Sequence, residues 1–196
     1  MNFLAHALLS GDDEMVLTGN MVADHVRGSQ LDLLPEAMRL GVQLHRRIDA
    51  FTDSHPVVKH TSLLLIPDFG KYAPVVLDIY FDHFLAIGWA RHGKGDLTVF
   101  AQRVYRTLLF NYHLLPARSR RILPWMIAQN WLAGYANLRD LQRVFYGMNR
   151  RASFQSGMDN AVQVLIENYS RVETAFNDFW PELSLDTMTF MSKLAR

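Results

Sequence analysis

The segment from residue 41 to residue 56, GVQLHRRIDAFTDSHP, concentrates side chains that can bind a metal or transfer a proton. His45 and Asp49 are four positions apart, so on a helix they project from the same side. An imidazole beside a carboxylate can ligate a metal ion or act as an acid–base pair. The same spacing also occurs in ordinary ion pairs on helix surfaces. We expect this segment to help hold a catalytic metal.

A second candidate lies in the helix expected over residues 72–89, which is apolar nearly all round and should therefore be buried. Asp78 and Asp82 lie four residues apart on one face of it, and His83 follows directly. Like charges at this spacing repel, and burying two carboxylates is costly unless a cation or hydrogen-bond donors compensate. We interpret this pair as an indication of a bound metal.

Two positions near the N-terminus extend the candidate set. Asp24 precedes His25 close to a helix end, so it could ligate a metal or cap the helix. His6 could ligate a metal or be a hydrogen-bonded core residue. Mixed imidazole and carboxylate ligation suits manganese, iron, magnesium or zinc. Such ions lower the pKa of water and clamp phosphoryl oxygens. The residue types therefore predict metal-assisted hydrolysis of a phosphate ester.

The elements that must position these residues are all predicted to be helices. Helical periodicity recurs along the chain, whereas the alternation typical of strands is missing. We predict an all-α fold of about eight helices, forming a single domain over residues 1–196. The helices that bear on the argument are expected over residues 2–10, 14–26, 35–56, 72–89 and 158–176, with a last short one after Pro181.

Composition narrows the class of protein. The chain is 49% hydrophobic and contains no cysteine, which excludes disulfides and thiolate ligands. No apolar run approaches the roughly 18 residues of a membrane span, and MNFLAH lacks the basic start of a signal peptide. We therefore expect a cytoplasmic protein without stable membrane association.

The net charge of +1 is unevenly distributed. Residues 91–151 carry 11 Lys and Arg against only Asp96 and Asp140, a net charge of +9, whereas the segments on either side are acidic. Arginine is well suited to binding carboxylates and phosphates. The asymmetry predicts that an acidic partner docks on the middle of the chain. The arginines expected to face outward and contact it are Arg103, Arg106, Arg139 and Arg143.

Four stretches carry a resemblance to a known family. MNFLAH, GNMVADHVRG (19–28), LHRRIDAFTDSHP (44–56) and LDIYFDHFLA (77–86) resemble, in this order, the acyl carrier protein phosphodiesterases. The resemblance implies a helical fold related to the HD-domain metal-dependent phosphohydrolases. It also implies hydrolysis of the phosphodiester that joins 4′-phosphopantetheine to a serine of holo-acyl carrier protein, with Mn²⁺ favoured and Mg²⁺ or Fe²⁺ as alternatives. Acyl carrier proteins are strongly acidic, which suits the basic segment.

The chain departs from the family pattern in containing no His-Asp dipeptide, so the ligands must be arranged differently. We expect the metal to be held by a set of seven candidates: His6, Asp24, His45, Asp49, Asp78, Asp82 and His83. Among these, Asp24, Asp49 and Asp82 are the catalytic candidates, and Asp24 is our choice for orienting or deprotonating the attacking water. Arg27 and Arg46 are expected to contact phosphate, because a guanidinium offers two donors to phosphate oxygens.

Two other functions fit parts of this pattern. The same metal site could act on a small nucleotide or another phosphomonoester. Alternatively, the chain could be a non-catalytic helical adaptor that binds an acidic protein through its arginines. A nucleic acid partner is not expected, because the basic segment lacks the interleaved aromatic residues of a base-stacking surface.

Overall fold

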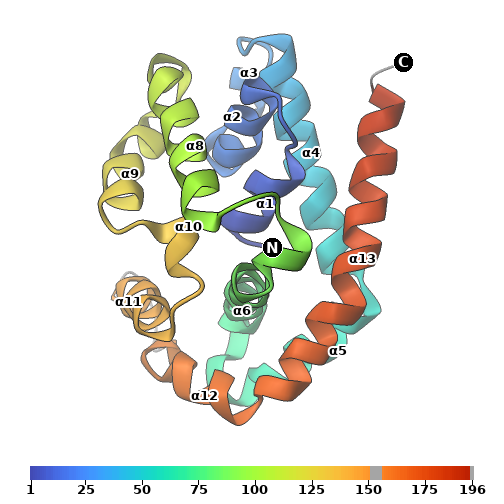
Figure 1. Ribbon diagram of the computed structural model, residues 1–196, viewed down its shortest axis with the longest axis vertical. Helices are drawn as coiled ribbons and strands as arrows, with labels where there is room; N and C mark the ends of the chain where they lie inside the picture. Colours follow the sequence, from blue (N-terminus) through green and yellow to red (C-terminus); the bar gives the residue numbers. More distant parts are fainter. Residues whose placement is uncertain (151–155, 195–196) are drawn as a thin grey trace.

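The computed structural model describes residues 1–150 and 156–194, and within these ranges the regular structure is entirely helical (Figure 1). This confirms the predicted all-α class. The α-helices are α1 (Phe3–Leu9), α2 (Glu14–Val22), α3 (Gly28–Leu31), α4 (Glu36–Ser54), α5 (Pro56–Phe69), α6 (Ala73–Ile87), α7 (Trp89–His92), α8 (Leu97–Phe110), α9 (Ala117–Ala128), α10 (Trp131–Gly134), α11 (Leu138–Asn149), α12 (Ala161–Glu167) and α13 (Tyr169–Leu194). Four short 3-10 segments accompany them: η1 (Ala23–His25), η2 (Gly70–Tyr72), η3 (Tyr112–Leu114) and η4 (Met158–Asn160).

Local sequence signals set several helix ends. The Asp13 carboxylate accepts hydrogen bonds from the second and third backbone N–H groups of α2, and Asp96 does the same for α8. Pro56 occupies the first turn of α5, where its missing N–H costs nothing. Gly70 ends that helix with a φ of +52°, a conformation that other residues rarely adopt. These helices are therefore delimited much as their sequence suggests.

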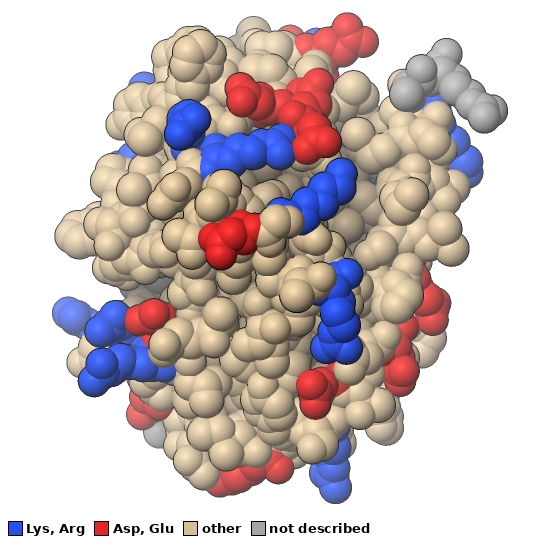
Figure 2. Space-filling view, in the orientation of Figure 1, with Lys and Arg blue, Asp and Glu red and all other residues tan. Residues whose placement is uncertain are grey.

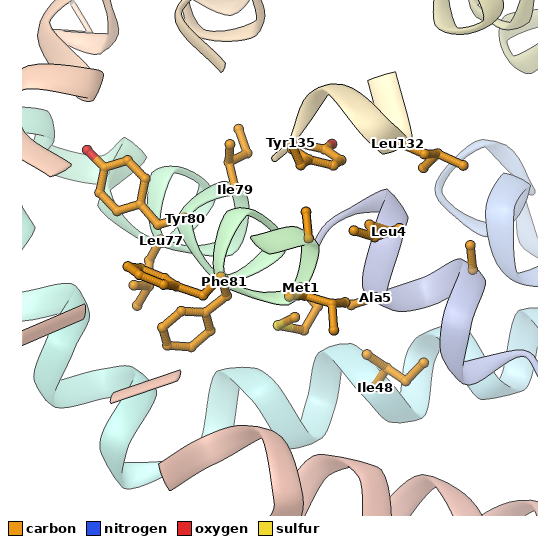
Figure 3. Packing of buried hydrophobic residues seen from close by; sticks show 14 of the residues in the cluster. Met1, Leu4, Ala5, Ile48, Leu77, Ile79, Tyr80, Phe81, Leu132 and Tyr135 are labelled. Atoms are coloured by element: carbon orange, nitrogen blue, oxygen red, sulfur yellow. The ribbon is translucent and has the colours of Figure 1, made fainter. Parts of the chain in front are cut away.

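Helix α6 lies at the centre of the core, as its apolar sequence predicted (Figure 1). It packs against α1, α5 and α13. Figure 3 shows Leu77, Tyr80 and Phe81 of α6 in one buried cluster with residues of other helices, including Leu4 and Ile48. Although α6 is so apolar, no helix in the described part of the chain is both long and apolar enough to cross a membrane.

The crossing of α2 and α4 depends on two glycines. A Cβ atom on Gly41 would lie 2.1 Å from the backbone oxygen of Val16, and one on Gly19 would lie 2.0 Å from that of Met38. Only glycine permits backbones to approach this closely. The crossing therefore brings Asn20, which follows Gly19, close to His45, which lies one turn after Gly41.

The C-terminal helices differ from the prediction. We expected one helix over residues 158–176 and a short one after Pro181, but α12 ends at Glu167 and α13 runs through Pro181 without a break. An interior proline removes a helix hydrogen bond and usually ends the helix. Here Phe179, Trp180 and Leu183 are buried on α13, which packs against α4, α5 and α6. This packing stabilises a continuous helix. The short helices also raise the number of elements above the predicted eight.

Candidate metal centre

Two histidines and one aspartate from α1 and α4 form a compact cluster. His6, His45 and Asp49 each place a ligand atom within 4.8 Å of the other two. The Nε2 atom of His6 lies 3.2 Å from one Asp49 oxygen, and Nε2 of His45 lies 3.0 Å from the other. The two imidazole rings are stacked, with centroids 4.1 Å apart. The predicted pair on α4 is therefore joined by a third residue, His6 of α1.

Asn20 of α2 orients both imidazoles. Its side-chain oxygen accepts a hydrogen bond of 2.9 Å from Nδ1 of His6, and its backbone oxygen accepts one of 2.9 Å from Nδ1 of His45. Its side-chain nitrogen donates to the backbone oxygen of His6 and to the hydroxyl of Ser10. Asn20 is fully buried, so these bonds are shielded from water. With both Nδ1 atoms engaged, both Nε2 atoms are directed at Asp49 and are available as ligands.

Asp24 stands at the rim of this cluster. It belongs to η1, directly after α2, and one of its carboxylate oxygens lies 3.2 Å from Nε2 of His45. Its side chain is 71% exposed, in contrast to the two histidines. The cluster opens into a cavity of about 290 Å³, whose lining also includes Met1, Asn2, Phe3, Met21, Asp53, Val75 and Asp78. Asp24 is thus accessible to water on one side and contacts the candidate ligands on the other.

Charge coupling dominates the electrostatics of the cluster. Burial disfavours the charged form of His45, but hydrogen bonds and charges from Asp24 and Asp49 outweigh it and raise the pKa of His45 to about 9. Burial prevails at His6, so its pKa is lowered. The hydrogen bond from His45 lowers the pKa of Asp24, and the two histidines hold the pKa of Asp49 well below its usual range despite burial. Both carboxylates are therefore anionic at neutral pH.

The donor set fits a divalent metal ion. Two imidazole nitrogens and a carboxylate suit Mn²⁺, Fe²⁺ or Zn²⁺, and a ligating histidine commonly donates its second N–H to a carbonyl oxygen. His6 and His45 both meet this condition through Asn20. A protein that offers three ligands leaves further coordination positions for water and substrate. His6, His45 and Asp49 would hold the ion, with Asp24 close enough to join them.

The structure corrects our interpretation of the carboxylates on α6. Asp82 is fully buried, and its oxygens accept hydrogen bonds from the backbone N–H groups of Asn2, Leu4 and Ala5 at the start of α1. Burial nevertheless raises the pKa of Asp82 to about 7. Asp78 lines the cavity, but its carboxylate lies 2.9 Å from the terminal amino group of Met1. Hydrogen-bond donors and this ammonium compensate the two carboxylates, so their burial is no argument for a metal.

His83 also lies outside the cluster. Its Nδ1 atom is 2.8 Å from the backbone oxygen of Tyr135, and its Nε2 atom is 3.2 Å from the hydroxyl of Tyr169. Both ring nitrogens thus have partners on α-helical segments remote in sequence from the candidate ligands. The structure therefore does not bring Asp82 and His83 into the cluster, because a helix that is buried all round directs its polar groups to several different neighbours.

The arginines predicted to contact phosphate or a partner have varied surroundings. Arg27 and Arg46 are exposed, and neither belongs to the lining of the cavity. Arg103 donates to Asp12 at 2.9 Å, and Arg143 to Asp140 at 2.7 Å. Figure 2 accordingly shows basic side chains next to acidic ones over α8 and α11. Arg106 and Arg139 are exposed. Arg151 of the basic segment lies outside the described residues.

Comparison with known proteins agrees with this site. The family model for acyl carrier protein phosphodiesterase matches residues 1–183, which include every residue of the cluster. This chain belongs to the acyl carrier protein phosphodiesterase family. A protein of that name from Photorhabdus laumondii is 31% identical over 182 residues, which is 92% of both chains. The one from Klebsiella pneumoniae is 33% identical over 184 residues, covering 93% of this chain and 95% of the relative.

No solved structure matches this family member, so its relation to the HD-domain phosphohydrolases stays a prediction. Family membership was expected from four sequence stretches, and three of them carry the cluster: His6 in the first, Asn20 and Asp24 in the second, and His45 and Asp49 in the third. Sequence reasoning missed the role of Asn20. Its signal was an amide in a mostly apolar helix, four residues before Asp24.

Proposed function

We propose that the protein is a metal-dependent hydrolase of holo-acyl carrier protein that breaks the phosphodiester between 4′-phosphopantetheine and the carrier serine. The observation that carries this proposal is the His6, His45 and Asp49 cluster, which opens into a cavity in a chain of the acyl carrier protein phosphodiesterase family. The products would be apo-acyl carrier protein and 4′-phosphopantetheine. We expect the reaction to take place in the cytoplasm, where carrier protein is available.

The residues of the site would have different roles in the hydrolysis. A divalent ion, for which we favour Mn²⁺, supplies Lewis-acid chemistry that lowers the pKa of water and offsets charge on the phosphoryl oxygens. Asn20 engages Nδ1 of both imidazoles, so Nε2 is the nitrogen that each would offer to the ion, and His45 would release its Nε2 proton when the ion binds. Asp24 would accept the proton of the attacking water, since it is anionic, exposed to the cavity and held by His45.

The decisive experiment incubates purified protein with holo-acyl carrier protein and Mn²⁺ and follows the carrier by intact mass spectrometry. We expect the carrier to lose one phosphopantetheine, and we expect chelator to prevent this loss. Asp49→Ala should reduce the rate by about 10²-fold or more, because it removes a candidate ligand that contacts both histidines.

A matched control is Asp53→Ala, which removes another carboxylate of the cavity that contacts neither histidine in the cluster. It should retain most of the activity. If metal-loaded protein leaves holo-acyl carrier protein unchanged but hydrolyses nucleotides, the carrier protein is not the substrate, and the alternative of a small-molecule phosphohydrolase takes its place.

A further inference from the structure

The stretch between Asp96 and Asp140 contains no acidic residue, so its cations lack acidic neighbours in sequence. Tertiary contacts supply Arg103 with Asp12, and Arg143 pairs with Asp140 on α11. Such pairs reduce the field that an approaching anion meets. On α9, both Arg118 and Arg121 are exposed, and no acidic partner within 4.0 Å is found for either among the described residues, whereas one arginine of α8 and one of α11 are paired.

These two arginines share one flank of α9 with an exposed tryptophan. Residues 118, 121 and 125 are spaced by three and four positions, so they lie on the same side of the helix. The opposite side is the buried one and carries Ser119, Leu123 and Met126. Trp125 is 63% exposed, which is unusual for so large an apolar ring. The flank therefore joins two arginines to an exposed aromatic residue, the types that dominate binding energy at protein interfaces.

Through its buried side α9 packs against the turn that carries Asp24, so the neighbouring flank lies near the candidate metal centre. The hydroxyl of Ser119 is 2.8 Å from Nδ1 of His25, the residue that follows Asp24 in η1. Burial lowers the pKa of His25, and the charge of Arg118 lowers it further, which places this guanidinium near the Asp24 turn. An apolar hollow beside α9 is lined by Ile122 together with Phe3 and Met21, two residues that also line the cavity of the metal centre.

We propose that the flank formed by Arg118, Arg121 and Trp125 is the docking surface for the acidic carrier protein. This inference rests on the proposed function for the identity of the partner. Carboxylates of the partner pair with the two guanidinium groups, which can each form two parallel hydrogen bonds to a carboxylate. Trp125 packs against an apolar part of the partner. The position next to η1 lets a docked carrier protein deliver its prosthetic arm to the cavity over a short path.

This assignment differs from the docking residues expected from sequence. Arg103, Arg106, Arg139 and Arg143 were chosen because they lie off the buried faces of their helices, but Arg103 pairs with Asp12 and Arg143 pairs with Asp140. On α9 neither arginine of the flank has an acidic partner within 4.0 Å among the described residues, and the exposed ring of Trp125 lies beside them. A surface that combines unpaired charge with exposed apolar area is the better fit to a protein partner.

The test measures binding separately from hydrolysis. Full-length protein treated with chelator is immobilised, and the affinity for holo-acyl carrier protein is determined by surface plasmon resonance. Arg118→Glu/Arg121→Glu should weaken binding by at least about tenfold, and Trp125→Ala should weaken it by a similar factor. The matched control is Lys59→Glu/Arg171→Glu, which makes the same change in net charge on exposed positions of α5 and α13 and should change the affinity less than about twofold.

The outcomes separate this inference from the proposed function. Unchanged affinity in the α9 double variant, an equal loss in the control, or no measurable binding by the unaltered protein would each overturn the docking assignment. If Arg139→Glu/Arg143→Glu weakens binding while the α9 variant does not, the surface expected from sequence is the correct one. If binding follows our expectation but no phosphopantetheine is released in the presence of Mn²⁺, the proposed hydrolysis fails and the docking surface stands.

Discussion

At the scale of single residues, Asn20 has the clearest structural role in the candidate centre. Its two oxygen atoms each accept a hydrogen bond from a different imidazole, and its side-chain nitrogen is satisfied by the backbone of His6 and by Ser10. Because every polar atom of this buried amide has a partner, its orientation is determined. Asn20 thereby determines which nitrogen of each histidine remains free.

Replacing Asn20 tests this role directly. Asn20→Ala should lower the affinity for Mn²⁺ roughly 10- to 100-fold, because loss of a partner that orients metal-ligating histidines typically costs that much. Isothermal titration calorimetry measures the effect. Ser10→Ala is the control, since it removes a neighbour of Asn20 that does not contact either ring, and it should have a much smaller effect. An unchanged affinity in Asn20→Ala would show that the imidazoles are oriented by other means.

At the scale of secondary structure, the start of α1 depends on a carboxylate from α6. Asp82 lies 78 residues from Leu4 in sequence and accepts its backbone N–H at 2.7 Å. The first N–H groups of a helix have no partner within the helix, so an acceptor from elsewhere satisfies them. This contact attaches α1, and with it His6, to the central helix of the core. Asp82 thus positions a candidate ligand from outside the cluster.

A comparison of stability and metal binding separates these two roles. Asp82→Ala should lower the free energy of unfolding by about 1–3 kcal/mol, because buried N–H groups lose their acceptor. Urea denaturation monitored by circular dichroism measures this change. Asp53→Ala, at an exposed position, should alter stability by less than about 0.5 kcal/mol. If Asp82→Ala abolishes metal binding without loss of stability, Asp82 is a ligand after all.

The crossing of α2 and α4 offers a second test at this scale. Gly41→Ala should destabilise the protein by about 1–3 kcal/mol, since the added carbon would overlap the backbone of Val16 and force the helices apart. Gly147→Ala is the matched control in α11, where a Cβ atom meets no other atom within 4 Å. It should be neutral or stabilise by about 0.5–1 kcal/mol. Equal stability of the two variants would contradict the close approach of α2 and α4.

At the scale of the whole molecule, the candidate centre joins parts of the chain that are already held by the hydrophobic core. His6, Asp24 and His45 come from three separate elements, and the hydrophobic core around α6 includes residues of α1, α2 and α4. We therefore expect the metal-free protein to be folded. A ligand that binds only the folded state stabilises it by an amount that grows with its concentration.

Thermal unfolding checks this expectation. Chelated protein should show a cooperative transition, and Mn²⁺ at about 100 times its dissociation constant should add about 2.7 kcal/mol of stability at 25 °C. The increase in Tm should disappear in Asp49→Ala, which lacks a candidate ligand. A metal-free protein without helical circular dichroism would mean that the ion is structural, and no metal-dependent shift would mean that the cluster does not bind Mn²⁺.

Much of this protein follows from sequence alone. The apolar periodicity predicted the helices α1, α2, α4 and α6 near their observed positions, and the spacing of His45 and Asp49 predicted that they share one face. The four family stretches predicted the family. These features are readable because helix formation, amphipathicity and contacts between positions i and i+4 are local properties of the chain.

Only the tertiary structure decided which polar residues meet. Asp82 and His83 looked like ligands because they are polar groups in a buried helix, but helix starts and carbonyls contributed by distant segments satisfy them. Asn20 had no predicted role, yet the α2–α4 crossing brings it against both imidazoles. The physical reason is that a buried polar group is costly without a partner, whereas the sequence does not specify which distant segment provides that partner.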